Sequence, residues 1–245
     1  MKKIIFLLIA GILVWGGSSL CLISNALAGE NQNIKVEFQQ IGQSSSILEE
    51  DFQVPVIKGW QNKKAEAEIN NKFFKVVSNF KKEMELVAQE AKKGHESLGY
   101  PTGKYQAITE GKVLYNKNDL LAISLNYYQY TGGAHGISYQ EVFNIDLRSG
   151  NILSLQDIFK PGSNYKRIID REIKHQISRN PENFFPEGEG GFQTISNKQS
   201  FLLKDNYLIF YFQPYEIACY AAGIVEFKIP FSKLKKTVKE RFISK

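Results

Sequence analysis

The chain has 245 residues, a formal net charge of +6 at pH 7 and 43% hydrophobic residues. Its basic residues are dispersed, apart from a C-terminal set without interleaved aromatic residues, so nothing in the composition indicates nucleic-acid binding. Only Cys219 lies beyond the apolar N-terminus, which excludes an internal disulfide once that segment is removed, and the length suits one large domain or two small ones.

The N-terminus has the pattern of a secretory signal. Lys2 and Lys3 precede an uncharged run that ends in Ala-Leu-Ala, which predicts a signal peptide over residues 1–28 with cleavage after Ala28. Two alternatives are a retained membrane anchor, since the run is long enough to span a bilayer, and a lipid on Cys21, which the large Leu20 disfavours. In each case we expect an extracytoplasmic protein, secreted or held at the cell surface, with membrane contact only if the signal is kept as an anchor.

The next segments predict two edge strands and a long helix. Residues 34–38 and 52–57 have strand character, and both are expected to be edge strands, the second interrupted by Pro55. Apolar residues recurring every three or four positions then predict an amphipathic helix over about 62–93, which Gly94 ends. The charged face of this helix mixes lysines and glutamates, which is typical of a solvated surface.

From residue 104 the helical spacing of apolar residues gives way to strand-forming sequence. Successive strands over 105–108, 111–115, 120–130 and 137–147 predict an antiparallel meander. The last two strands flank the sequence Gly-Gly-Ala-His-Gly at residues 132–136. Three glycines in five positions permit left-handed backbone and close approach, so His135 lies on a loop of unusual shape. This loop is either a plain wide turn or part of a site.

The C-terminal half predicts a short helical turn over 154–159, a helix over 165–178 capped by Ser163 or Asn164, and an acidic loop over 181–197 with phenylalanine anchors. Strands over 206–212 and 223–229 follow, and a basic helix over 232–242 ends the chain. Its apolar residues Phe231, Leu234, Val238 and Phe242 are expected to point inward.

Chemical motifs are sparse. His95, His135, His175 and Cys219 are scattered, without HExxH, CxxC or HxH spacing, and Glu172 with His175 lacks the second copy that a di-iron bundle needs. There is no GxSxG nucleophile motif and no phosphate-binding glycine loop leading into a helix. We therefore expect no metal and no cofactor, and the balance favours a non-enzyme without settling the question.

Three passages carry a resemblance to a known family: TGGAHG at 131–136, NIDLRSGNILSLQDIF at 144–159, and NYLIFYFQPYEIACYAAGIVEFKIPFSKL at 206–234. Together they resemble the bacterial extracytoplasmic family called domain of unknown function 3298 (DUF3298). The helix-bearing region before them resembles its usual companion, domain of unknown function 4163 (DUF4163). Cys219 departs from the family pattern, which has proline at that position.

The resemblance implies a cell-envelope module, because the same pair forms the extracellular part of lysozyme-sensing anti-sigma-V factors and precedes the catalytic domain of a peptidoglycan deacetylase. We expect no sigma factor as partner, since only Met1 to Lys3 precede the apolar run, and no deacetylation, since little chain follows the module. The implied role is that of a non-catalytic binding module for a lysozyme-like protein or for peptidoglycan. The alternative is an enzyme or enzyme accessory acting on peptidoglycan, with His135 as acid/base and Glu216 or Glu141 as partner.

The expected fold class is α+β, with two small lobes that each pack an antiparallel sheet against one or two helices. We expect an N-terminal lobe over 29–133 and a C-terminal lobe over 134–245, with the glycine turn at the junction, where ligand clefts are common. The predicted ligand-binding residues are Tyr130, Gly132, Gly133, His135, Tyr215, Glu216 and Tyr220. A purely structural reading has Glu216 accepting backbone hydrogen bonds to hold its own loop.

Overall fold

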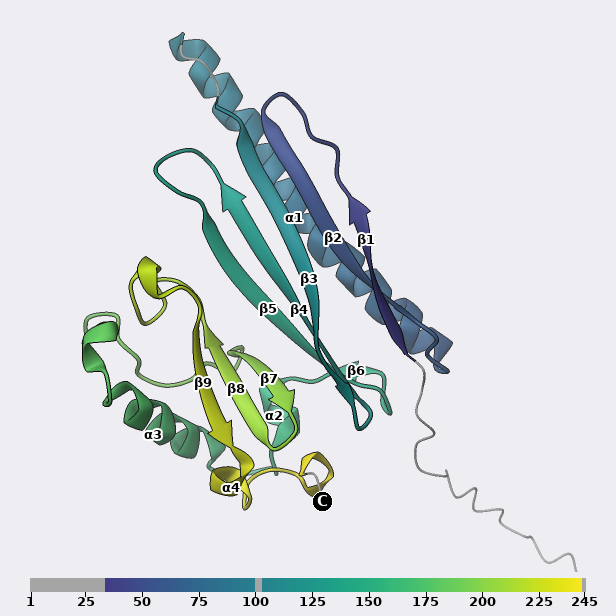
Figure 1. The fold of residues 1–245 in the computed structure, drawn as a ribbon, viewed down its shortest axis with the longest axis vertical. Coiled ribbons are helices and arrows are strands. Elements are labelled where there is room, and N and C mark those ends of the chain that lie inside the picture. The colour runs from purple at the N-terminus through teal and green to yellow at the C-terminus, as the bar shows by residue number, and fades with distance from the viewer. Residues whose placement is uncertain (1–33, 100–102, 244–245) are drawn as a thin grey trace, which may run out of the picture. The chain divides into compact units, whose positions relative to one another are not determined.

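The computed structural model describes residues 34–99 and 103–243, and the expected signal peptide lies outside them. Its strands form a six-stranded sheet in the order β1-β2-β3-β4-β5-β6 and a three-stranded sheet in the order β7-β8-β9, which confirms the α+β class (Figure 1). The strands of the first sheet are β1 Lys35–Ile41, β2 Leu48–Lys58, β3 Tyr105–Lys117, β4 Leu120–Tyr130, β5 Ile137–Asp146 and β6 Asn151–Ile152, and those of the second are β7 Ser200–Lys204, β8 Tyr207–Phe212 and β9 Val225–Pro230.

The six-stranded sheet is mixed rather than purely antiparallel. β2 and β3 are parallel, with α1 (Lys63–Leu98) as the connection between them, whereas the other neighbouring pairs are antiparallel. The expectation that the strand containing Pro55 is an edge strand is wrong, because β2 lies between β1 and β3. The pairing of β2 with β3 ends at Phe52, however, so Pro55 lies where β2 pairs with β1 alone and no hydrogen bond to β3 is lost.

Helix α1 extends beyond the predicted stop at Gly94. It begins after Asn62, whose side chain accepts a hydrogen bond from the Ala65 amide, and ends at Gly99, which adopts the left-handed conformation at φ 73°. Gly94 costs helix stability but does not break the hydrogen-bonding pattern. The buried face of α1 packs on the sheet and consists of Ala65, Ile69, Phe73, Val77, Phe80, Met84 and Ala88.

The strands expected at 105–108 and 111–115 form one continuous strand, β3, which passes through Gly111. A β-carbon on Gly111 would lie 2.2 Å from the Phe38 ring, so the glycine makes room for an aromatic side chain from β1 rather than ending a strand. The hairpin of β4 and β5 spans residue 133, the expected lobe boundary. The structure therefore keeps β5 in the first sheet, and that sheet does not divide at the glycine turn.

The three-stranded sheet is covered by α3 (Tyr165–Ile177). β7 was missed by the sequence analysis because Phe201, Leu202 and Leu203 form a short continuous apolar run without alternation. The short helix at 154–159 is confirmed as α2 (Leu155–Ile158). Three short 3₁₀ segments are Pro181–Asn183, Tyr220–Ala222 and Glu240–Phe242.

The helix expected over 232–242 is wrong, since α4 covers only Phe231–Leu234. Val238 instead forms an isolated β-bridge with Phe159, and the Lys160 amide donates to the Thr237 carbonyl at 2.7 Å. Burial of Phe231, Leu234 and Val238 agrees with the apolar pattern. After one last turn, in which the Val238 amide donates to the Leu234 carbonyl at 3.1 Å, pairing with the segment after α2 takes the place of a continued helix and keeps the same residues inside.

Two side-chain amides join the sheets. Asn144 on β5 is fully buried, donates to the Phe201 carbonyl at 2.7 Å and accepts from the Leu203 amide at 2.8 Å. Gln213, after β8, donates to the Gln140 carbonyl and accepts from the Gln140 amide, both at 2.9 Å. Each amide imitates one step of a β-ladder, so the two sheets are held in a defined register against each other.

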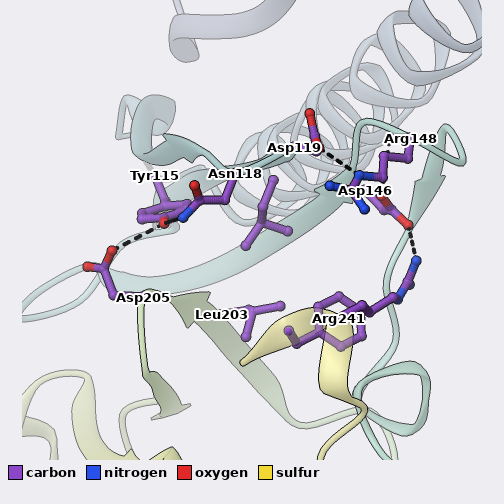
Figure 2. Close-up of a pocket in the computed structure, with 10 residues that line it drawn as sticks. Tyr115, Asn118, Asp119, Asp146, Arg148, Leu203, Asp205 and Arg241 are labelled. Atoms are coloured by element: carbon purple, nitrogen blue, oxygen red, sulfur yellow. Dashed lines mark hydrogen bonds and ion pairs between the residues drawn. The ribbon is translucent and has the colours of Figure 1, made fainter. Parts of the chain in front are cut away.

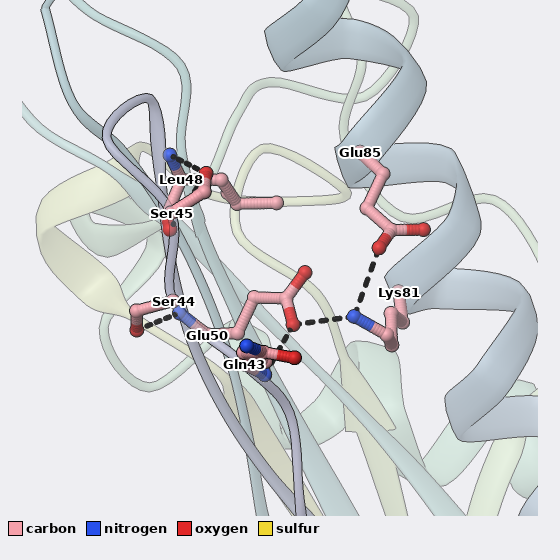
Figure 3. A network of polar contacts seen from close by, with 7 residues as sticks. All are labelled: Gln43, Ser44, Ser45, Leu48, Glu50, Lys81 and Glu85. Atoms are coloured by element: carbon pink, nitrogen blue, oxygen red, sulfur yellow. Dashed lines mark hydrogen bonds and ion pairs between the residues drawn. The ribbon is translucent and has the colours of Figure 1, made fainter.

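A carboxylate holds the β1–β2 loop to α1 (Figure 3). The Glu50 side chain is 3% exposed, accepts from the Gln43 amide at 2.8 Å and pairs with Lys81, which also bonds to Glu85 at 2.9 Å. Burial alone would lower the pKa of the Lys81 ammonium, but its bonds to the two carboxylates outweigh burial and raise the pKa.

We expect Glu50→Gln to lower the free energy of unfolding by about 1–2 kcal/mol, because a charge-assisted bond in a buried position is lost. Glu85→Gln is the matched control, since it removes the other partner of the same lysine from a side chain that is 42% exposed. Its cost should be about 0.3–0.5 kcal/mol. Urea denaturation at pH 7 measures both, and equal costs would contradict the special role of the buried partner.

The start of α2 predicts an acid-dependent contribution to stability. Partial burial would raise the pKa of Asp157, but hydrogen bonds from the Ser154 amide and hydroxyl, with Lys239 and Arg241 nearby, lower it below its ordinary value of 3.8. A depressed carboxyl pKa contributes stability that is present above pH 3.8 and is lost as the pH falls through the folded-state value.

Asp157→Asn should therefore be less stable than the wild type at pH 7 by about 0.5–1 kcal/mol, and this difference should shrink below about pH 4. Urea midpoints measured from pH 7 to pH 2 for both proteins test this. A difference that stays constant over the whole range would show that the charge of Asp157 is not responsible.

Candidate functional site

The β4–β5 loop is held by its own backbone carbonyls. The Tyr130 hydroxyl donates to the Gly133 carbonyl at 2.9 Å, and Gly132 and Gly133 adopt positive φ angles of 90° and 99°, which residues with a β-carbon rarely tolerate. His135 Nδ1 lies 2.9 Å from the Gly136 carbonyl, so this nitrogen carries the proton and donates. The loop presents an exposed imidazole on an ordered backbone.

The β8–β9 loop is held by Glu216. Its carboxylate accepts from the Gln213 amide at 2.7 Å and from Gln199 Nε2 at 3.2 Å, so one of its two bonds is to the backbone of its own loop. Tyr215 adopts a left-handed φ of 68°, and its amide donates to the Ala218 carbonyl at 3.1 Å. This turn directs the Tyr215 side chain outward, where it is 54% exposed.

The two loops meet through their aromatic rings. His135 stacks on Tyr220 with ring centroids 4.2 Å apart and an interplanar angle of 18°, and Tyr220 stacks on Tyr215 at 5.8 Å. The Tyr220 hydroxyl donates to the Gly136 carbonyl at 2.8 Å. These three rings, the aromatic stack, form a partly exposed surface built from segments about 80 residues apart. The predicted ligand-binding residues lie in these two loops, except Tyr130, which is the last residue of β4.

A cleft of about 390 Å³ lies next to the aromatic stack, between the two sheets. Tyr128 and Ser138 line it from β4 and β5, and Ile224 and Glu226 line it from the opposite side, with Glu110 from β3. The Tyr128 ring would be 2.5 Å from a β-carbon on Gly136, so the loop glycine allows this ring to approach the stack. Two carboxylates make the inter-sheet cleft acidic.

The predicted ligand-binding residues do not include Tyr128, Glu110, Glu226 or the bridging Gln213. Each lies in a strand or at a strand end, where the sequence carries only the alternation of a sheet. A polar residue at the point where β8 ends, directly before Pro214, was the one local signal for Gln213. Their role depends on which strands face one another, which no local pattern encodes.

The partners proposed for an acid/base role of His135 are engaged elsewhere. Glu141 accepts a hydrogen bond from Tyr127 at 3.0 Å, on the face of the sheet that packs against α1, where burial raises the pKa of Tyr139 to about 12 and raises that of Tyr127 further. Within residues 34–99 and 103–243, no hydrogen bond or ion pair joins His135 to either Glu141 or Glu216.

Two further residues considered for chemistry form surface contacts. Glu172 pairs with Lys233, and His175 Nε2 lies 3.3 Å from Arg179. In the described part of the chain, no group of three or more His, Cys, Asp or Glu side chains has an arrangement that could hold a metal ion. The same residues contain no helix that is both long and apolar enough to cross a membrane.

Fold and site together define an α+β module that displays an aromatic stack beside an acidic cleft. Residues 156–232 match the family model described as "Protein of unknown function (DUF3298)", which confirms the resemblance to that family over this segment. Residues 41–138 match the model described as "Deacetylase PdaC", where the sequence analysis expected DUF4163.

Two Bacillus subtilis proteins are similar to the chain over most of its length. The peptidoglycan-N-acetylmuramic acid deacetylase PdaC is 26% identical over 226 residues, which are 91% of this chain and 46% of the deacetylase. The anti-sigma-V factor RsiV is 29% identical over 217 residues, which are 85% of this chain and 71% of that protein. The chain thus spans less than half the length of the deacetylase. These relatives support an envelope-related module.

Solved structures share the fold. A DUF3298 family member from Bacteroides fragilis has a TM-score of 0.63 and 20% identity, covering 87% of this chain and 96% of that one. A DUF3298 family protein from Pseudomonas aeruginosa has a TM-score of 0.60 and 20% identity, covering 88% and 98% respectively. At this identity the similarity concerns the fold alone.

Proposed function

We propose that the chain is a non-catalytic, extracytoplasmic binding module of the bacterial cell envelope. Its ligand is a lysozyme-like protein or a cell-wall glycan, and the aromatic stack is the contact surface. The observation that carries this proposal is the stacking of His135, Tyr220 and Tyr215, which joins the two loops of the candidate site into one exposed surface.

The chemistry of this surface suits recognition. Tyrosine and histidine rings offer large, rigid contact areas with polar tips, and the faces of such rings favour both cationic side chains and the C–H faces of sugars. Glu110 and Glu226 in the adjacent cleft add acceptors for cationic groups or hydroxyl groups. A ligand that covers both the stack and the cleft would bury aromatic surface and satisfy these carboxylates.

The similarity to a peptidoglycan deacetylase and to an anti-sigma-V factor supports the envelope setting. The two relatives differ in function, so what they share with this chain is more consistent with recognition than with one particular reaction. Glu216 accepts a hydrogen bond from its own loop, and Glu141 accepts one from Tyr127. These bonds also favour a binding role over a catalytic one.

Calorimetry and pull-down with lysozyme and with soluble peptidoglycan fragments test the proposal. We expect one of the two ligands to bind the wild type, and Tyr220→Ala to weaken that binding by at least about 30-fold. Binding of neither ligand, under conditions where a DUF3298 family relative binds, would overturn it.

A turnover assay on peptidoglycan addresses the alternative of an enzyme. Wild-type turnover that disappears in His135→Ala or Glu216→Ala would favour an enzyme acting on the glycan. Because Glu216 also holds the β8–β9 loop, a thermal melt of each variant must accompany the assay.

A further inference from the structure

Figure 2 shows a second cavity, of about 330 Å³. It shares no lining residue with the inter-sheet cleft. It is formed where the β3–β4 turn, the β7–β8 turn and the segment after β5 meet the C-terminal 3₁₀ segment. Nothing in the candidate site described above uses these residues. Three aspartates and two arginines line it, so its lining carries a formal charge of −1.

One end of the cavity presents guanidinium groups. Arg148 Nε pairs with Asp119 at 2.6 Å, and Arg241 pairs through one terminal nitrogen with the buried Asp146 at 2.9 Å. Each arginine therefore uses a single nitrogen for its aspartate. The remaining N–H groups have no other bond within the described residues, and paired guanidiniums of this kind accommodate a carboxylate readily.

The other end presents acceptors. One oxygen of Asp205 accepts a hydrogen bond from the Tyr115 hydroxyl at 3.1 Å. The side-chain amide of Asn118 donates a hydrogen bond to the same hydroxyl at 3.2 Å. Among residues 34–99 and 103–243, the second Asp205 oxygen and the Asn118 side-chain oxygen accept no hydrogen bond, so both can accept from a ligand. Among the described residues, Asp205 takes part in no ion pair, so it is the cavity's uncompensated charge.

The two ends are separated by apolar side chains. In Figure 2, Asp205 and Tyr115 lie on one side and Arg148 and Arg241 on the other, with Leu203 between them. Leu120 also lines the cavity. A ligand that fits this arrangement has a cation at one end, an anion at the other and an apolar middle.

We propose that this cavity binds a short peptide with free ends. Its ammonium group pairs with Asp205 and the Asn118 carbonyl oxygen, its carboxylate takes the free N–H groups of Arg148 and Arg241, and an apolar side chain rests on Leu120 and Leu203. A zwitterion satisfies both ends at once, whereas a purely anionic ligand would face Asp205 and a purely cationic one would face two arginines. The volume is within the range of small-molecule sites, at its lower end.

The test is calorimetry of the full chain with the dipeptide alanyl-leucine and with its N-acetylated and C-amidated forms. We expect the free dipeptide to bind and each blocked form to bind at least 10-fold more weakly. Asp205→Asn should also reduce the affinity for the free dipeptide at least 10-fold, while asparagine tolerates the left-handed backbone at this turn, where φ is 49°.

Glu226→Gln is the matched control, because it removes the same charge from the inter-sheet cleft, and it should leave dipeptide affinity unchanged. Arg148→Gln should lower the affinity for the free dipeptide but leave the affinity for the C-amidated form unchanged. Absence of dipeptide binding, or equal affinity for the free and blocked forms, would overturn the proposal. The comparison of ligands needs only the wild type, so it stands even if a variant fails to fold.

Discussion

Asn144→Ala is expected to lower the free energy of unfolding by about 2–4 kcal/mol, because both of its side-chain hydrogen bonds are buried and neither partner can reach water. The Phe201 carbonyl would lose its donor and the Leu203 amide its acceptor, both on the edge of β7. Urea denaturation followed by circular dichroism measures this loss.

Asn126→Ala is the control for that measurement. Asn126 lies on the neighbouring strand β4, is only partly buried and receives a single side-chain bond, from Gln140 at 2.8 Å. We expect it to cost less than about 1 kcal/mol. Asn144→Asp should be at least as destabilising as Asn144→Ala, since it places a carboxylate where a donor is required. Similar costs for Asn144→Ala and Asn126→Ala would show that the amide does not join the sheets as described.

Tyr220→Ala is expected to weaken binding of the envelope ligand by at least about 30-fold, the effect typical of a central aromatic contact residue. Tyr220 stacks on both His135 and Tyr215, and it also ties the two loops through the Gly136 carbonyl. Its removal would therefore separate the rings and release the loops. Calorimetry with whichever ligand binds the wild type gives the affinity.

Tyr220→Phe separates the ring from the hydroxyl. It keeps the stack but loses the bond to Gly136, so we expect a smaller loss, of about 10-fold or less. A ligand-independent check is available by NMR, because the Tyr220 ring lies parallel to the His135 ring and shifts its proton resonances. That shift should persist in Tyr220→Phe and vanish in Tyr220→Ala. Its persistence in Tyr220→Ala would contradict the observed stacking.

Several elements could be predicted because their signals are local. The apolar period of α1, and the turn at Ser154 that starts α2, are readable within one segment, and both are present in the structure. Gly132 and Gly133 predicted a left-handed backbone, and both residues have positive φ angles in the structure. Interactions between near neighbours in sequence produce these features, so near neighbours suffice to predict them.

Other features were predicted wrongly, because contacts between distant segments overrode the local sequence pattern. The helix expected over 232–242 stops at Leu234, since Val238 forms a β-bridge with Phe159 through the backbone of its two neighbours and takes a place in the core. The interruption expected between residues 108 and 111 is absent, and Gly111 lies inside β3, where Phe38 of β1 fills the space that a β-carbon would take. In each case a partner about 70 or more residues away determines the conformation.

The sequence by itself determined the α+β class, the loop around His135 and the resemblance of its three marked passages to one family. Only the tertiary structure decided that the His135 loop and the Tyr215–Tyr220 loop share one aromatic stack, and that Glu216 accepts hydrogen bonds from Gln213 and Gln199. The physical reason is that stacking and hydrogen bonding act over a few ångströms in space. Residues 135 and 220 are within that range in the folded protein, where the amides of Asn144 and Gln213 join the two sheets.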